Sequence, residues 1–219
     1  MTKLLPELYR SRFDEREATA KDAIWHEIVR YLQRYIDPDA PVLDLGCDRG
    51  HFIRWVKASE RWATDIRDMR DALPGDVRFV QASGLDLAER LPDVKFGAIF
   101  MSNYLEHLES SDAVIDQLRI AAGLLRPKGR VIVLQPNIRL VGQRYWDFID
   151  HRVALTERSL LEAAELAGLA TIDLVTRFLP YSTKGRLPTN PALVRAYLAF
   201  RPAWSLLGKQ TLFVGERAR

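Results

Sequence analysis

The chain has 219 residues and a single cysteine, Cys47. One cysteine excludes an intrachain disulfide and a cysteine-based metal cluster, and it fits a reducing compartment. Residues 1–10 lack the apolar centre of a signal peptide. No stretch approaches the run of about 20 apolar residues that crosses a bilayer. We therefore expect a cytoplasmic protein.

The chain also has little net charge, because its 32 basic residues nearly balance its 29 acidic ones and leave only +3. Such a balance is poor evidence for binding to nucleic acid, so we expect no nucleic-acid partner. Basic residues meet few acids only in the last third of the chain, which suggests that this region faces something anionic. They are Arg177, Lys184, Arg186, Arg195, Arg201 and Lys209.

The length and the 47% of hydrophobic residues are those of one globular domain, spanning 1–219, with a sizeable core. Within it we expect a helical segment over 1–37, a core over 38–178, a helical insertion over 179–208 and a final strand over 209–219. Short apolar runs alternate with helical stretches, which favours a parallel sheet with helices on both faces. The predicted strands are 42–45, 62–65, 77–81, 97–101, 131–135, 171–176 and 211–215, and the predicted helices are 14–36, 51–58, 112–125 and 156–167.

A glycine-containing turn, Asp44–Gly50, directly follows the first predicted strand. Gly46 and Gly50 allow the backbone to pass close to a ligand. Asp65 closes the second predicted strand, where a carboxylate can accept both hydroxyls of a ribose. The third glycine of a dinucleotide fingerprint is missing, and Asp48 repels phosphate. These features indicate a nucleoside cofactor without phosphates.

In this context, Val42–Phe52 resembles motif I of the class I S-adenosylmethionine-dependent methyltransferases. Four later segments resemble, in order, the ribose-binding motif, the adenine-side strand end, the strand that runs into a Glu-His-Leu helix, and the Leu-x-Pro-x-Gly turn with its strand. They are 63–66, 79–83, 96–108 and 125–133. The resemblance implies an α/β, Rossmann-like, doubly wound sheet of seven strands with the last strand antiparallel, and S-adenosyl-L-methionine as the cofactor. N-terminal helices and a helical insertion before the last strand complete the expected fold.

The resemblance also implies roles for single residues. Asp44 and the backbone of Gly46 would lie near the methionine ammonium, Asp65 on the ribose and Ile66 against the adenine. Ser83 stands where the family often has an acid that contacts the adenine amine. Asp48 stands where the family commonly has glycine, and aspartate tolerates a left-handed backbone better than most residues. The remaining cofactor-binding candidates are Cys47, Gly50, Gly84, Met101 and Ser102.

Four segments, 102–108, 135–139, 145–151 and 155–160, resemble a bacterial subgroup that is often met among cell-surface polysaccharide genes. We take this as a hint that the acceptor is a small molecule or a glycan. The substrate-binding candidates are Asn103, Asn137, Arg139, Tyr145, Trp146 and Asp147.

Methyl transfer from a sulfonium is an in-line displacement, and a hydroxyl acceptor must also lose a proton. We expect oxygen as the acceptor atom, with two candidate bases after the fourth and fifth strands. His107 could instead shape the cofactor pocket. His151 is the favoured base, since Asp147 stands one helical turn earlier and could orient its ring, although it could instead satisfy loop backbone. No second acidic pair accompanies Asp147, Asp150 and His151, so we expect no catalytic metal.

The insertion carries many apolar residues between Tyr181 and Gly208, and Pro202 interrupts any single helix. We expect a lid or a subunit contact in an oligomer, with a peripheral membrane contact as the alternative. Two other functions stay open: a non-catalytic S-adenosylmethionine-binding module and a nicotinamide-dependent oxidoreductase.

Overall fold

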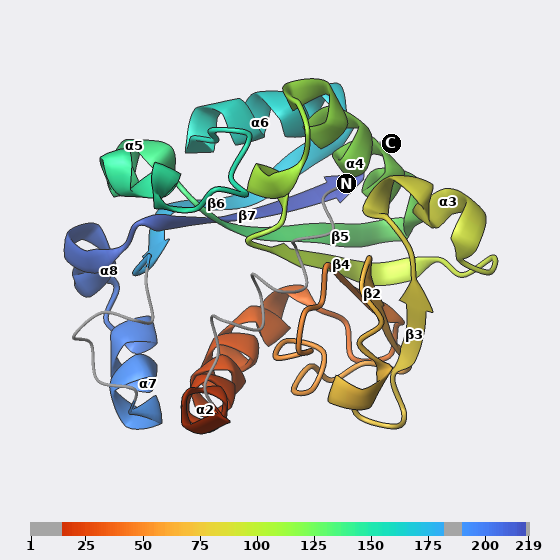
Figure 1. Cartoon of the computed structure of the whole chain (residues 1–219), viewed down its shortest axis with the longest axis horizontal. Helices are drawn as coiled ribbons and strands as arrows, with labels where there is room; N and C mark the ends of the chain where they lie inside the picture. Colours follow the sequence, from red (N-terminus) through yellow and green to blue (C-terminus); the bar gives the residue numbers. More distant parts are fainter. Residues whose placement is uncertain (1–14, 182–189, 218–219) are drawn as a thin grey trace.

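The computed structural model describes residues 15–181 and 190–217, and residues 15–20 as backbone only. A seven-stranded sheet runs through its centre in the order β3-β2-β1-β4-β5-β7-β6 (Figure 1). Strands β1 to β5 are parallel, whereas β7 pairs antiparallel with both β5 and β6. This order confirms the predicted Rossmann-like sheet with an antiparallel last strand. The strands are β1 (Val42–Leu45), β2 (Arg61–Asp65), β3 (Arg78–Gln81), β4 (Phe96–Ser102), β5 (Leu125–Pro136), β6 (Leu169–Leu179) and β7 (Gln210–Arg217).

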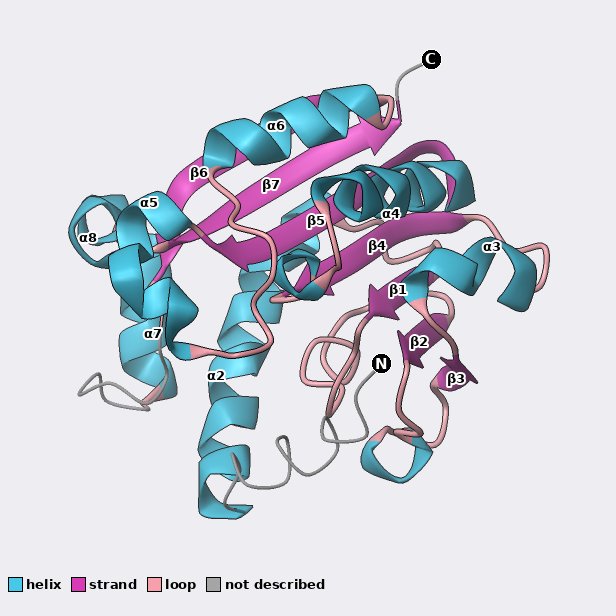
Figure 2. Ribbon diagram, turned by 45° about the horizontal axis from the view of Figure 1, so that its top comes forward, coloured by secondary structure: helices cyan, strands magenta, loops and turns pink. Residues whose placement is uncertain are grey.

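Helices cover both faces of the sheet (Figure 2). One face carries α3 (Leu87–Arg90), α4 (Ser111–Leu124) and α6 (Glu157–Leu166), and the other carries α2 (Glu15–Leu32), α7 (Pro191–Ala199) and α8 (Arg201–Leu207). Each covered face holds its own apolar cluster. Successive residues of a strand therefore enter opposite clusters, and the central strands are apolar almost throughout. In β4, for example, Ile99 packs on the α4 side and Ala98 on the α2 side.

The ends of two predicted helices are set by local chemistry. The Ser110 hydroxyl accepts a bond from the amide of Ala113 at the start of α4. Thr156 and Ser159 form a capping box at the start of α6, and Gly168 follows that helix with a φ of +76°. These caps provide hydrogen-bond partners for backbone groups that the end of a helix leaves unpaired. The predicted start and stop of α6 are confirmed.

One predicted helix is wrong. Residues 51–55 form hydrogen-bonded turns and residues 56–58 form no regular element, although the apolar spacing over 51–58 is typical of a helix. The amide of Ile53 bonds to the Asp44 side chain, so it does not enter a regular helical ladder.

The insertion before β7 consists of two helices within its described part, because Pro202 lies in the first turn of α8. Residues 182–189 of the predicted insertion lie outside the described residues. Arg195 of α7 pairs with the buried carboxylate of Glu27 on α2, at 2.7 Å, which attaches the insertion to the N-terminal helix. Among the described residues, no helix has the length and apolar character needed to cross a membrane.

Short elements follow the carboxyl ends of the strands and position the residues discussed below. They are η3 (Gly84–Asp86) after β3, η4 (Leu105–His107) after β4, and α5 (Ile138–Val141) with η5 (Gly142–Asp147) after β5. Two further turns, η1 (Gln33–Tyr35) and η2 (Arg70–Ala72), lie after α2 and β2.

Candidate active site

The turn after β1 is a backbone cradle. Gly46 and Gly50 both have a φ of +72°, and Asp48 between them has a φ of +45°. The amides of Gly46 and Cys47 both donate to the carbonyl of Thr64, each at 2.9 Å. Three left-handed residues in five make a sharp turn that only glycine and a few short polar residues adopt cheaply. Asp48 adopts the backbone conformation that the sequence analysis expected of an aspartate here.

Close packing also requires glycine at two of these positions. A Cβ atom on Gly46 would lie 2.5 Å from the ring of Tyr104, and one on Gly50 would lie 2.3 Å from Leu73. Tyr104 also lies against Gly84, and its hydroxyl donates to Gln117 at 2.9 Å. The tyrosine thus forms one wall between the β1 and β3 turns. It was not among the predicted site residues, although it stands in the segment that follows β4.

Three carboxylates face this turn. Asp44 is almost fully buried, and burial raises its pKa to about 8, with the Asp65 carboxylate adding to the rise. Asp65 closes β2 and is 7% exposed, and Asp48 lies in the turn itself. One arginine, Arg67, pairs with both Asp65 and Asp48. An environment with more carboxylates than cations favours a sulfonium and an ammonium over a pyrophosphate.

Arg67 is hydrogen-bonded to Asp65, the carboxylate that was predicted to bind the ribose. The Asp65 oxygens accept bonds from the Arg67 amide at 2.9 Å, from its Nε at 3.0 Å and from its Nη2 at 3.1 Å. They also accept a bond from the Asp48 amide at 3.1 Å. A ribose at this position therefore competes with the guanidinium. The sequence reasoning missed this pair, although Arg67 stands only two residues after Asp65.

The other predicted cofactor-binding residues differ in how far their side chains are exposed at the cradle. The Ile66 side chain is 41% exposed beside Asp65, as expected of a residue that meets an adenine. Ser83 accepts a bond from the Leu85 amide, so its hydroxyl caps η3. Met101 is fully buried in the core and Cys47 is 6% exposed, so these two side chains pack the interior. A cofactor would meet them only through their backbone, and this contact stays a prediction.

The two predicted bases belong to one cluster. His107 and His151 come from different loops, yet their ring centroids lie 5.1 Å apart. The loop after η5 docks on η4 because the Glu106 carbonyl accepts bonds from the amides of Arg152 and Val153, at 2.8 and 3.1 Å. These backbone bonds bring the two imidazoles together. Sequence reasoning had treated them as rivals.

Each imidazole is held by its surroundings. The Nδ1 atom of His107 lies 3.0 Å from the carbonyl oxygen of Asp150, an acceptor that fixes the proton on Nδ1. The ring of His151 stacks on Phe148 at 5.2 Å and lies 4.6 Å from the ring of Tyr145. Tyr145 is fully buried and donates to the Val153 carbonyl at 2.5 Å. The Tyr145 ring therefore supports the loop from inside, which argues against the predicted substrate contact of this residue.

Glu106 completes this cluster. It is 1% exposed, and neither carboxylate oxygen has a hydrogen-bond partner among the described residues. Burial raises its pKa, and the neighbouring His107 opposes the rise. One of its oxygens and one ring nitrogen of each histidine lie within 4.8 Å of one another. Glu106 lies in the predicted Glu-His-Leu segment, but the spacing of that segment does not indicate that its carboxylate turns inward.

Asp147 was predicted to orient His151, but Asp150 is the aspartate that lies beside the two histidines. Helix η5 ends at Asp147, so Asp147 and His151 do not share a helical turn. Asp147 is exposed, and so is its neighbour Trp146, at 52%. Asp150 lies against the cluster instead, with its Oδ2 atom 3.7 Å from Nδ1 of His107. Asn103, with a φ of +46°, and Ser102 are joined by a 3.3 Å side-chain bond at the end of β4.

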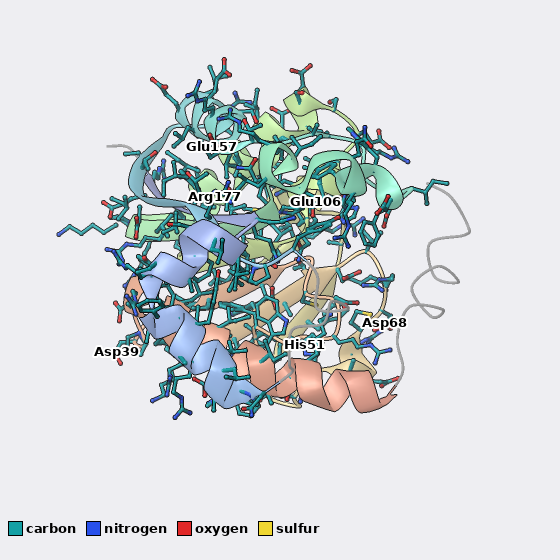
Figure 3. All side chains as sticks on the ribbon, turned by 90° about the vertical axis from the view of Figure 1, so that its left-hand side faces the viewer. Asp39, His51, Asp68, Glu106, Glu157 and Arg177 are labelled. Carbon is teal, nitrogen blue, oxygen red and sulfur yellow. The ribbon has the colours of Figure 1, made fainter. Side chains whose placement is uncertain are left out.

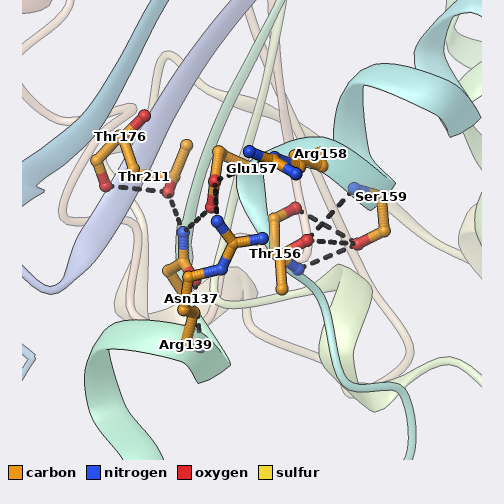
Figure 4. Close-up of polar contacts among 8 residues, drawn as sticks. All are labelled: Asn137, Arg139, Thr156, Glu157, Arg158, Ser159, Thr176 and Thr211. Carbon is orange, nitrogen blue, oxygen red and sulfur yellow. Dashed lines mark hydrogen bonds and ion pairs between the residues drawn. The ribbon is translucent and has the colours of Figure 1, made fainter.

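Asn137 and Arg139 belong to a separate polar network below α6 (Figure 4). Asn137 is fully buried, and its amide donates to Glu157 at 2.7 Å and to Thr211 at 3.1 Å. Arg139 donates to the other Glu157 oxygen at 2.8 Å. Asn137 therefore joins the end of β5 to α6 and β7, which corrects its assignment as a substrate contact. Arg139 remains half-exposed beside it.

The chain is similar to one family of known proteins and to several solved structures. The model of a family described as "Methyltransferase domain" matches residues 15–174. No curated protein matches the chain. A SAM-dependent methyltransferase from Archaeoglobus fulgidus has a similar structure, with a TM-score of 0.66 and 16% identity over 97% of this chain and 100% of that one.

Two further solved structures are similar. A S-adenosylmethionine-dependent methyltransferase from Clostridium acetobutylicum has a TM-score of 0.64 and 15% identity, over 97% of this chain and 96% of that one. The CcbJ methyltransferase from Streptomyces caelestis has a TM-score of 0.62 and 16% identity, over 89% and 90%. At these identities the structures show a shared fold.

Because the family model covers well over half of its length, the chain belongs to the methyltransferase-domain family. It is an enzyme, and its cofactor is S-adenosylmethionine. The acidic cradle after β1 and β2 fits a cationic nucleoside without phosphates, as the sequence predicted.

Proposed function

We propose that the protein transfers the methyl group of S-adenosylmethionine to a hydroxyl oxygen of a small molecule or glycan, and that the hydroxyl loses its proton at the His107–His151 pair. The observation that carries this proposal is the pairing of two imidazoles, 5.1 Å apart, at the same edge of the sheet as the cradle. Ligands of open α/β sheets bind outside the carboxyl ends of the strands.

The chemistry divides between two groups of residues. Asp44 and the Gly46 turn hold the amino-acid end of the cofactor, and Asp65 holds its ribose. As the C–O bond forms, the C–S bond breaks and the sulfonium becomes a neutral thioether. The acceptor proton leaves at the histidine pair. Positioning and proton removal are the contributions that such a displacement asks of a protein.

Oxygen is favoured over nitrogen because a hydroxyl needs a proton acceptor, whereas a neutral amine can attack first and lose its proton afterwards. The His107 ring suits this task, since its Nδ1 proton is directed at the Asp150 carbonyl and its Nε2 lone pair faces away from that bond. Exposed Trp146 and half-exposed Phe148 offer aromatic surface to a sugar or a phenol.

The test is a panel of acceptors with S-adenosylhomocysteine release as the readout. Phenols, catechols and free sugars form one arm, and amines of matched shape form the other. We expect turnover in the hydroxyl arm, with His107→Ala and His151→Ala each losing about 10²- to 10⁴-fold. Turnover on amines alone, undiminished in both variants, would overturn the oxygen assignment.

The insertion supports a peripheral membrane contact as part of this proposal, which suits a lipid-linked acceptor. Phe200 is 61% exposed and Leu206 is 79% exposed, beside the basic Arg201. Apolar and basic side chains together favour an anionic interface. Sedimentation with vesicles of anionic lipid measures this contact, and Phe200→Ser with Leu206→Ser should abolish it. Binding that persists in the double variant argues for a different surface.

A further inference from the structure

The cluster around Glu106 has a composition that proton transfer alone does not explain. It joins one carboxylate to two imidazoles, and these three groups come from η4 and from the loop that docks on it. Their oxygen and nitrogen atoms lie within 4.8 Å of one another. Figure 3 shows Glu106 under the α5–η5 segment, on the far side of the sheet from His51 and α2.

The Glu106 carboxylate is the second observation. An ionised carboxylate that is 99% buried without a hydrogen bond is costly, and proteins remove the cost by protonation or by a bound cation. The described residues bring no arginine or lysine into ion-pair distance of it. What lies within reach of this carboxylate is one ring nitrogen from each of two imidazoles, and such nitrogens are common ligands of metal cations.

His107 is oriented in the manner of a metal ligand. Metal-bound histidines generally donate their second ring N–H to a carbonyl or a carboxylate, which fixes the tautomer and aims the other nitrogen. The Nδ1 atom of His107 lies near two oxygens of Asp150, the backbone carbonyl oxygen at 3.0 Å and a carboxylate oxygen at 3.7 Å. Nε2 is therefore the nitrogen left to bind.

We propose that Glu106, His107 and His151 form a binding site for a divalent first-row transition-metal cation. Two imidazoles and one carboxylate suit zinc, manganese or iron(II), whereas magnesium prefers oxygen ligands and water. Three protein ligands leave a coordination position for an acceptor hydroxyl, as in catalytic zinc sites. Filling the site needs small side-chain rotations, since ligand atoms around zinc lie roughly 3.4 Å apart.

This inference replaces the expectation of a site without metal, which considered Asp147, Asp150 and His151. It rests on the proposed function only for its catalytic role. With the cation bound, the imidazoles are ligands and no longer accept the proton, so the bound hydroxyl, whose pKa the cation lowers, gives its proton to water instead. Binding of the cation is independent of the acceptor. The imidazoles then hold the ion that activates the hydroxyl.

The experiment uses full-length protein purified on an affinity tag without histidine and stripped with a chelator. Zinc, manganese and magnesium are titrated separately against a chromogenic chelator, and cobalt is added to record a visible absorption spectrum. We expect one equivalent of zinc or manganese with no competition from magnesium. Glu106→Gln and His151→Gln should each weaken binding by at least about 100-fold.

The matched control is His51→Gln, which alters a partly buried histidine that pairs with Asp22 on the opposite face. It should keep the full affinity for the metal. Binding of S-adenosylhomocysteine, measured in every variant, reports folding and tests the cofactor site separately. Wild-type protein that binds no stoichiometric metal overturns the proposal, even if cofactor binding is intact. Equal affinity in Glu106→Gln, or loss in His51→Gln alone, overturns the ligand assignment.

Discussion

Replacing Asp65 with asparagine tests whether this carboxylate binds the cofactor ribose. The charge-assisted bonds that it would give the ribose are worth about 1.5–3 kcal/mol. In the structure its oxygens already accept three bonds from Arg67 and one from Asp48. A ribose that binds Asp65 must displace these Arg67 contacts, so its net gain in binding free energy is smaller than the full value of the new bonds. The binding energy lost on removing the carboxylate should therefore lie near the lower end of this range. We expect Asp65→Asn to weaken S-adenosylhomocysteine binding about 10-fold.

The same variant should also lose stability. An asparagine must turn an NH₂ group toward the Asp48 amide or the Arg67 guanidinium, and a donor facing a donor costs about 1–3 kcal/mol. Affinity must therefore be measured by calorimetry at a temperature where the variant is folded. Asp68→Asn is the matched control, since Asp68 lies three residues later, is exposed and pairs with Arg70. That control should leave both the affinity and the melting temperature unchanged.

A ligand without the ribose hydroxyls separates binding from a general disturbance of the loop. Wild-type protein should bind a deoxyribose analogue of S-adenosylhomocysteine about 10-fold more weakly than the parent compound. Asp65→Asn should not distinguish the two ligands. If the variant still prefers the parent compound by the same factor, the ribose lies elsewhere and Asp65 serves the loop.

Three further predictions concern the cradle and the insertion. Burial raises the pKa of Asp44 to about 8, and the ammonium of a bound ligand favours the ionised carboxylate. S-adenosylhomocysteine should therefore bind more tightly as pH rises from about 6.5 to 8.5, and calorimetry should show that binding releases a proton. Asp44→Asn should show neither the pH dependence nor the proton release. Gly46→Ala should lower the free energy of unfolding by more than about 2 kcal/mol, because a left-handed alanine also meets the Tyr104 ring. Gly168→Ala, with a similar φ and open space, should lose only about 1 kcal/mol in the same denaturant titration. Glu27→Gln should destabilise the fold by about 1–3 kcal/mol at neutral pH, since it breaks the buried bonds to the arginines of α2 and α7. These bonds hold the pKa of Glu27 below its usual value, so the stability they add is present above the unfolded pKa and is lost as pH falls through the folded pKa. A difference in stability that does not shrink as the pH falls through the acid range would contradict this reasoning.

Most of the fold could be predicted because hydrophobic period and helix ends are local signals. The strand pattern, the capping residue Thr156 and the stop at Gly168 are all readable from short windows of sequence. The turns at 51–58 show the limit of such signals. Their spacing is that of a helix, but the bond from the Ile53 amide to Asp44 is tertiary, and no local pattern reports it.

The cofactor side of the site was predictable for a similar reason. Its backbone needs glycine or a short polar residue at fixed positions, and Asp44, Gly46 and Asp65 follow strand ends that meet at one edge of the sheet. What spacing could not reveal was competition among the side chains. Arg67 lies on Asp65, and Ser83 caps a turn, because each found a partner within two residues.

The acceptor side was harder because its geometry depends on one loop docking on another. His107 and His151 are 44 positions apart, and the distant loop is held beside η4 by two backbone bonds to the Glu106 carbonyl and by the bond from His107 to the Asp150 carbonyl. The same region buries Tyr145, which was a substrate-binding candidate on sequence grounds. A residue after a strand can therefore be located by sequence, whereas the direction of its side chain cannot.

The segment after β4 connects the two halves of the site. The Tyr104 ring packs on Gly46 and Gly84, which border the cofactor cradle. Glu106 and His107, in the next turn of the chain, form the cluster with His151. Tyr104 is the N-cap residue of η4, and Glu106 and His107 lie within that same three-residue 3-10 turn. One short backbone segment therefore positions both the wall of the cofactor cradle and two members of the Glu106 cluster, so the end of β4 fixes the distance between the two halves of the site.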